Sequence, residues 1–117
     1  MIYQKEQLDS PVKFLDGKPV LISKDSPEPL TVRLAIRHAM SGLYQDEQPN
    51  MAQFQATSMG TLTLERKMKR YEISKKVWAD TPEVNLTVEE LAEIKTCLSK
   101  YFYGETLGFL IDFLEKQ

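Results

Sequence analysis

The sequence predicts a mainly α-helical protein, with about four helices in a small bundle and a short β-hairpin near the N-terminus. Apolar residues recur at helical spacing along much of the chain after residue 30. Two helix starts carry capping residues, and an Asp-Gly pair separates two short apolar runs near the front of the chain. At 117 residues, with 42% hydrophobic and 27% charged residues, the chain has the size and composition of one soluble domain spanning 1–117.

The hairpin is expected at residues 11–23, with Asp16 and Gly17 in its turn. Glycine at the second turn position tolerates the positive φ of a type I′ turn. Pro19 has no N–H to donate, so its strand should lie at the edge of a sheet. An isolated hairpin is only marginally stable in water, and this one should therefore lie on the helical body or pair with something else.

Helices are expected at residues 31–43, 62–79, 87–103 and 105–115. Thr31 is the predicted N-cap of the first. The third has the most complete start signal, because Thr87 is followed three residues later by Glu90, its capping-box partner. Leu86 and Leu91 would form the accompanying hydrophobic staple.

Each helix has apolar residues at a spacing that predicts a core-facing side. These are Val32, Ala35, Ile36, Ala39, Met40 and Leu43 in the first; Leu64, Met68, Tyr71 and Trp78 in the second; Leu91, Ile94, Leu98 and Tyr101 in the third; and Leu107, Leu110, Ile111 and Leu114 in the fourth. Residues 44–60 are rich in Gln and lack such spacing, which predicts a long loop exposing Met51, Phe54 and Met59.

The second helix contains the stretch LERKMKRYEISKKVW, which has six basic residues. Projected onto a helix, they point in nearly every direction, whereas a nucleic-acid-binding helix would gather them on one surface. Residues 60–78 carry six basic and two acidic groups, and residues 79–117 carry three basic and eight acidic groups. Packing of the two segments against each other would explain this asymmetry without an outside partner.

A second apolar strip runs along the same helix, through Ile73 and Val77 and beside Arg66 and Arg70. A helix that is apolar on two sides is either buried within its own domain or bound to a partner, and we favour burial. Residues 101–103 are three consecutive aromatic residues, at least one of which should be exposed. The candidate partner-binding surfaces are the hairpin edge and residues Met51, Phe54, Met59, Arg66, Arg70, Ile73 and Val77.

Residues that could support catalysis are sparse. The sequence has no glycine-rich phosphate loop, nucleophile elbow or zinc-protease motif. His38 lies beside apolar positions, and Cys97 has no second cysteine, so a structural zinc site would lack two ligands. Glu89, Glu90 and Glu93 lie near a helix N-terminus, where carboxylates stabilise the helix dipole. We therefore expect no enzymatic activity, no metal and no cofactor.

The composition also restricts where the protein works. The net charge of −2 gives no general attraction to nucleic acid or to anionic membranes. No apolar run approaches the roughly 20 residues that span a bilayer, and the first residues do not form a signal peptide. A single cysteine suits a reducing compartment. We expect a cytoplasmic protein.

The order of motifs resembles that of small helical bacteriophage and prophage proteins of uncharacterised function. Their pattern is a D-G-x-P turn, a "pLTlr-A" helix, a "kRYelA-kI" helix and an "Lt-eE-IK" helix, followed by a short terminal helix. The matching stretches here are KFLDGKPV, PLTVRLAIRHAM, RKMKRYEISKKVWA and LTVEELAEIK, so that 12–40 and 66–114 are covered. The chain departs from the pattern at 104–109, where GETLGF replaces a more aliphatic run.

The resemblance implies a phage or prophage context and no catalytic role. Proteins of this kind act by binding other proteins, for instance as assembly chaperones or modifiers of host machinery. The leading hypothesis is thus a non-enzymatic protein that binds a phage or bacterial partner, with a homodimer through the hairpin edge as a further option. The second hypothesis is a nucleic-acid-binding regulator that uses helix 64–78 with Arg33 and Arg37. The third, an enzyme, would need a pocket that places His38 beside carboxylates.

Overall fold

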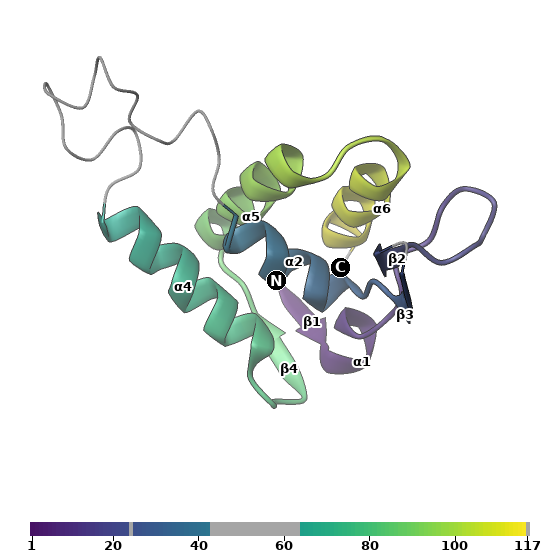
Figure 1. The fold of residues 1–117 in the computed structure, drawn as a ribbon. Coiled ribbons are helices and arrows are strands. Elements are labelled where there is room, and N and C mark those ends of the chain that lie inside the picture. Colours follow the sequence, from purple (N-terminus) through teal and green to yellow (C-terminus); the bar gives the residue numbers. More distant parts are fainter. Residues whose placement is uncertain (24, 43–63, 117) are drawn as a thin grey trace, which may run out of the picture.

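The computed structural model describes residues 1–23, 25–42 and 64–116, and this part of the chain is mainly helical, as predicted (Figure 1). It contains five helices and two short antiparallel sheets of two strands each. The helix absent from the prediction is α1 (Lys5–Leu8), a single turn that buries Leu8. The predicted loop at 44–60 lies outside the described residues.

The first strand, β1 (Ile2–Gln4), pairs with β4 (Glu83–Asn85), which connects two of the later helices. Tyr3 lies opposite Val84, and both side chains are buried. The hydroxyl of Tyr3 donates a hydrogen bond to the backbone oxygen of Leu114, at 2.7 Å. The N-terminal segment is therefore tied to the C-terminal half of the chain, a pairing that the sequence analysis did not predict.

The Asp16–Gly17 turn is present, and Gly17 has the expected positive φ, at +86°. The predicted type I′ turn is wrong, because such a turn needs a positive φ at both central residues and only glycines among the described residues have one. The backbone N–H of Phe14 donates to the oxygen of Lys18, at 2.9 Å. An isolated β-bridge joins Lys13 to Pro19, which has no N–H to contribute to a longer ladder. This first hairpin is thus short.

The chain then forms a second hairpin that was not predicted, between β2 (Leu21–Ser23) and β3 (Ser26–Pro29). Three buried or half-buried residues join the segments in a ring. The N–H of Val12 donates to the oxygen of Leu30, that of Leu30 to Val20, and that of Val20 to Val12, at 2.7–2.8 Å. Each segment thereby supplies a partner for the next, and the side chains of Val12 and Leu30 join the hydrophobic core that the helices share.

The longer described helices are α2 (Val32–Met40), α4 (Leu64–Trp78), α5 (Val88–Tyr101) and α6 (Gly104–Glu115). The hydroxyl of Thr31 caps α2 by accepting from the N–H of Leu34, at 3.2 Å. Thr87 and Glu90 form the predicted capping box at the start of α5, with N···O distances of 2.9 and 3.1 Å. Both predicted caps are therefore confirmed.

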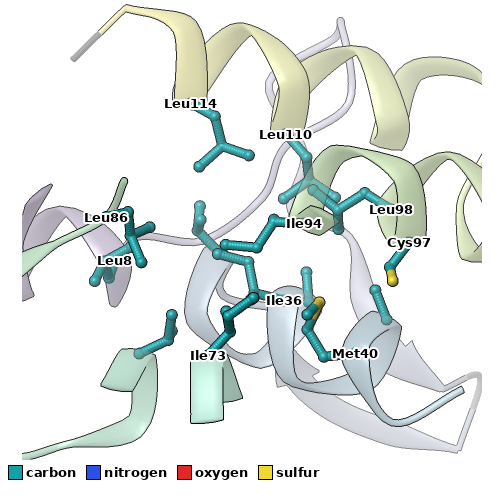
Figure 2. Packing of buried hydrophobic residues seen from close by; sticks show 14 of the residues in the cluster. Leu8, Ile36, Met40, Ile73, Leu86, Ile94, Cys97, Leu98, Leu110 and Leu114 are labelled. Carbon is teal, nitrogen blue, oxygen red and sulfur yellow. The ribbon is translucent and has the colours of Figure 1, made fainter. Parts of the chain in front are cut away.

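The core lies where α2 packs against α4 and α5, with α6 packing on α5 (Figure 1). The expected apolar face of α2 is buried from Val32 to Met40, and its last member, Leu43, lies outside the described residues. In α6, Leu110 and Leu114 are buried, and Leu107 and Ile111 are partly buried. Figure 2 shows Ile36 and Met40 of α2 and Leu110 and Leu114 of α6 in one cluster with Leu8 from α1, Ile73 from α4, Leu86 from the β4–α5 connection, and Ile94, Cys97 and Leu98 from α5. Tyr101 was expected here but is 46% exposed at the end of α5, where its ring stacks on that of His38 from α2.

The predicted core face of α4 is wrong. Leu64, Met68, Tyr71 and Trp78 are 63%, 49%, 56% and 44% exposed. The buried residues of this helix are Arg70, Ile73 and Val77. The spacing of apolar residues cannot decide which of the two apolar sides of α4 is buried. The ion pairs described in the next section favour burial of the side that carries the arginines.

Candidate functional site

Glu93 of α5 joins the two arginines of α4. Its carboxylate accepts from Nε of Arg70 at 2.7 Å and from Nε and Nη2 of Arg66 at 3.2–3.3 Å. Arg70 is 3% exposed and Glu93 is 8% exposed, so both charges are largely removed from water. Burial by itself raises the pKa of Glu93, but the hydrogen bonds and charges of Arg70 and Arg66 outweigh it and hold the pKa below its ordinary value.

A second ion pair links the same helices nearer the start of α5. Nζ of Lys76 donates to Oε1 of Glu90 at 2.8 Å, and this carboxylate oxygen also accepts from the N–H of Thr87. Burial raises the pKa of Glu90, and the bonds from Lys76 and Thr87 lower it further than burial raises it. Three of the six basic residues of α4 thus bind acidic residues of α5, which confirms that the charged segments pack against each other.

The candidate partner-binding residues of α4 occupy this inward side. Ile73 and Val77 are each 1% exposed, and Arg70 lies beside them. The structure therefore selects burial within the domain over an exposed partner-binding strip, and it corrects the surface assignment of these three residues. Arg66 reaches Glu93 from the rim, with a side chain that is 40% exposed. The other candidates, Met51, Phe54 and Met59, lie outside the described residues.

The outward side of α4 forms one wall of a groove of about 640 Å³, and the C-terminal half of α2 forms the other. We call it the α2–α4 groove. Its lining residues are Arg37, Met40, Ser41, Lys67, Tyr71, Ser74, Lys75, Trp78 and Ala79.

Cations lie over both aromatic rings of this groove. The guanidinium carbon of Arg37 is 4.6 Å from the ring centroid of Trp78, and Nζ of Lys75 is 5.4 Å from that of Tyr71. Arg33 approaches Trp78 from the buried side, at 5.8 Å, and its Nε lies 3.3 Å from a carboxylate oxygen of Asp9. The groove is therefore apolar in its walls and positively charged at its rim.

The sequence contains a signal for this groove. Lys67 and Lys75 interrupt the face that carries Tyr71 and Trp78, which is unusual for a face that enters a core. Charged residues inside an apolar stripe are a reason to expect that stripe at the surface. The contribution of Arg37 could not be read from helix 64–78, because it comes from another helix.

A second exposed surface lies where the hairpins meet the corner between α5 and α6, and we call it the hairpin end. Its large exposed side chains are Phe14, Leu15, Leu21, Ile22, Tyr101 and Tyr103. Leu15 and Tyr103 stand out, at 90% and 87% exposed. Three adjoining hollows share lining residues here, the largest being about 850 Å³ between the 14–17 turn and the first turns of α6.

The hairpin end is held in place by a polar contact. The N–H of Leu15 donates to Oε1 of Glu105 at 2.9 Å, which fastens the turn to the start of α6. The exposed aromatic residues of 101–103 confirm that at least one of the three faces solvent. Leu15 was not a predicted site residue, since a leucine inside a presumed strand gives no signal of exposure.

Other kinds of site are sparse within the described ranges. No three His, Cys, Asp or Glu side chains there are grouped to hold a metal ion. None of the described helices has the length and apolarity to cross a membrane. His38 is partly buried and lies beside Leu30, Tyr101 and Thr106 in one of the hollows.

Comparisons with protein-family models, with curated proteins and with solved structures found no match for this chain.

Proposed function

We propose that this is a non-enzymatic phage or prophage protein that works in the bacterial cytoplasm by binding a protein partner through the hairpin end. The observation that carries the proposal is the gathering of six large exposed apolar side chains over adjoining hollows. Soluble monomers rarely expose contiguous apolar surface of this kind unless it binds something. The phage context rests on the resemblance of the motifs, and the partner comes from the phage or from its host.

The chemistry of the hairpin end matches that of protein interfaces. Aromatic residues are enriched in the centre of such interfaces, and a few large side chains supply most of the binding energy. Leu15 lines the hollow above α6, and Tyr103 lines the adjoining hollow, which shares Phe14, Gly104 and Glu105 with it. An interaction of this type is consistent with an assembly chaperone or with a modulator of phage or host machinery.

Nucleic-acid binding through α4 is the weaker alternative. Arg66, Arg70 and Lys76 are engaged by carboxylates of α5, so they do not form a row that could follow successive phosphates. Arg33, which the alternative also requires, is 8% exposed and lies near Asp9.

The test is an affinity pull-down of the tagged protein from infected bacterial lysate, with and without nuclease, read by mass spectrometry. The variant Leu15→Ser/Tyr103→Ser removes the two most exposed side chains of the hairpin end. It should fold normally, because Tyr103 is the N-cap of α6 and makes no side-chain cap bond, whereas serine is a favoured cap. Val88→Ser is the matched control, since Val88 is 79% exposed at the start of α5.

The proposal expects a stoichiometric partner that survives nuclease, is lost with the double variant and is retained by the control. Partners that vanish with nuclease would instead support the nucleic-acid alternative. If only the protein itself is recovered, and the double variant makes it monomeric, the hairpin end is a homodimer contact. A partner that binds the double variant as well as the parent would show that another surface is used.

A further inference from the structure

We propose that the α2–α4 groove is a separate docking site for an acidic peptide segment that also carries bulky apolar residues. This inference does not depend on the hairpin end, which lies on other elements. It rests on the charge of the groove, on the side chains in its walls and on where the remaining basic residues of α4 point.

The first argument is charge complementarity. Arg37, Lys67 and Lys75 line the groove, and no carboxylate is among its described lining residues. The nearest partner of Lys75 is the exposed Glu72 of the same helix, at 4.0 Å, a contact that solvent screens. The whole chain has a net charge of −2, so this concentration of positive charge is local. An occupant with carboxylates would place them against the rim, where partly desolvated charge pairs favour association and fix orientation.

The second argument concerns the apolar part of the occupant. Tyr71 and Trp78 are 56% and 44% exposed and offer apolar surface to the groove, whereas Met40, which also lines it, is only 5% exposed. Pockets for small molecules enclose most of their ligand, whereas this groove is open to solvent along two helices. Open grooves between helices commonly receive a peptide that inserts a few large side chains.

The third argument favours a peptide over nucleic acid. Proteins that bind single strands stack bases on free aromatic faces and follow the backbone with a row of cations. Here Arg37 lies over the ring of Trp78 and Lys75 lies over that of Tyr71. A cation therefore already lies over each ring, so the cations of the groove do not form a row beside free aromatic faces. A fourth and fifth cation, Arg66 and Arg70, turn away toward α5.

The chain provides its own probe of this site. Trp78 is the only tryptophan, so its fluorescence reports directly on the groove. The full chain is titrated with a short synthetic peptide in which glutamate alternates with leucine and phenylalanine. Parallel titrations use the same peptide with lysine in place of glutamate, a peptide of glutamate and serine without apolar residues, and oligothymidylate.

The matched variants are Lys67→Glu and Lys69→Glu. Both lysines are exposed on α4 and lie two residues apart, but only Lys67 lines the groove. The proposal expects the acidic apolar peptide to shift the emission of Trp78, and the lysine and serine peptides to bind at least tenfold more weakly. Reversing the charge of Lys67 should weaken binding about five- to tenfold, and reversing that of Lys69 should change it less than twofold.

Several results would overturn the proposal. They are no response to the acidic peptide, equal weakening by the two variants, or tighter binding of oligothymidylate that falls steeply with salt. A fourth is an emission that ignores the peptide but shifts when Asp46 and Glu47 are replaced by lysine, since the occupant would then be the chain's own segment. A fifth is self-association of the chain that Lys67→Glu abolishes and Lys69→Glu does not, since the occupant would then be a second copy.

Discussion

Replacing Glu93 by glutamine tests directly whether the ion pairs of Glu93 with Arg70 and Arg66 hold α4 in its orientation on α5. The substitution keeps the size of the side chain and one carbonyl acceptor, but it removes the negative charge that faces Arg70 and Arg66. Arg70 is 3% exposed, so water cannot replace the carboxylate that it loses. We expect Glu93→Gln to destabilise the packing of α4 on α5 far more than a typical substitution of a charged residue.

The size of the destabilisation follows from the two ion pairs that Glu93 makes, with Arg70 and with Arg66. A hydrogen bond to a charged group contributes about 1.5–3 kcal/mol to stability. The bond from Nε of Arg70 to Oε1 of Glu93 is 2.7 Å long and buried, so we assign it this whole contribution. The contact with Arg66 counts for less, because that side chain is 40% exposed and solvent screens it. The expected loss in the free energy of unfolding is about 2–3 kcal/mol, which corresponds to a fall in Tm of roughly 10 °C for a chain of this length.

Urea denaturation followed by far-UV circular dichroism measures this loss. Glu89→Gln is the control, because Glu89 is exposed on the same helix and its removal should cost about 0.5 kcal/mol or less through the helix dipole. A loss below about 1 kcal/mol for Glu93→Gln, or equal losses for the two variants, would refute the claim that Glu93 fixes the orientation of α4.

Three further results are expected. Val77→Ala should lower the free energy of unfolding by about 2 kcal/mol, because it truncates a core residue, whereas Tyr71→Ala should lower it by less than about 1 kcal/mol. Thermal or urea unfolding measures both losses, and the reverse order would show that the side of α4 predicted from spacing is the buried one. Thr87→Ala should cost about 1 kcal/mol, because it removes the capping box, and an unchanged urea midpoint would contradict this. The pKa values of Glu93 and Glu90 lie below their ordinary value of 4.5. The stability that these carboxylates contribute is therefore present above pH 4.5 and is lost as the pH falls through their lower folded-state pKa values. Urea midpoints measured from pH 6 downward should show this decline, and the decline should be smaller for Glu93→Gln.

The elements read correctly from sequence are those governed by nearby residues. The capping box of Thr87 and Glu90 involves residues three positions apart, and the turn at Gly17 depends on the φ of one residue. The inward face of α2 was also predictable, because its apolar residues occupy a single side. The pairing of Glu93 with Arg66 spans 27 positions, and only the excess of opposite charge on the two segments pointed to it.

The candidate surfaces show the same division. The sequence contains Tyr71 and Trp78 of the groove and Leu15 and Tyr103 of the hairpin end, but of their exposure it predicted only that at least one of residues 101–103 faces solvent. Spacing predicted that the first two would be buried, because a large apolar side chain at helical spacing usually faces a core. The groove also needs Arg37 from α2, and the hairpin end needs two hairpins and a helix corner to meet.

The sequence by itself therefore determined the mainly helical character of this protein, the caps that start α2 and α5, the first turn and the opposing charges of α4 and α5. The tertiary structure alone decided which side of α4 is buried, the pairing of β1 with β4, and the second hairpin. The physical reason is that capping and helix periodicity act over a few residues of backbone. The rotation of a helix with two apolar sides, by contrast, is set by the sum of contacts and ion pairs with distant segments, and the same contacts leave Tyr71 and Trp78 facing solvent in the groove.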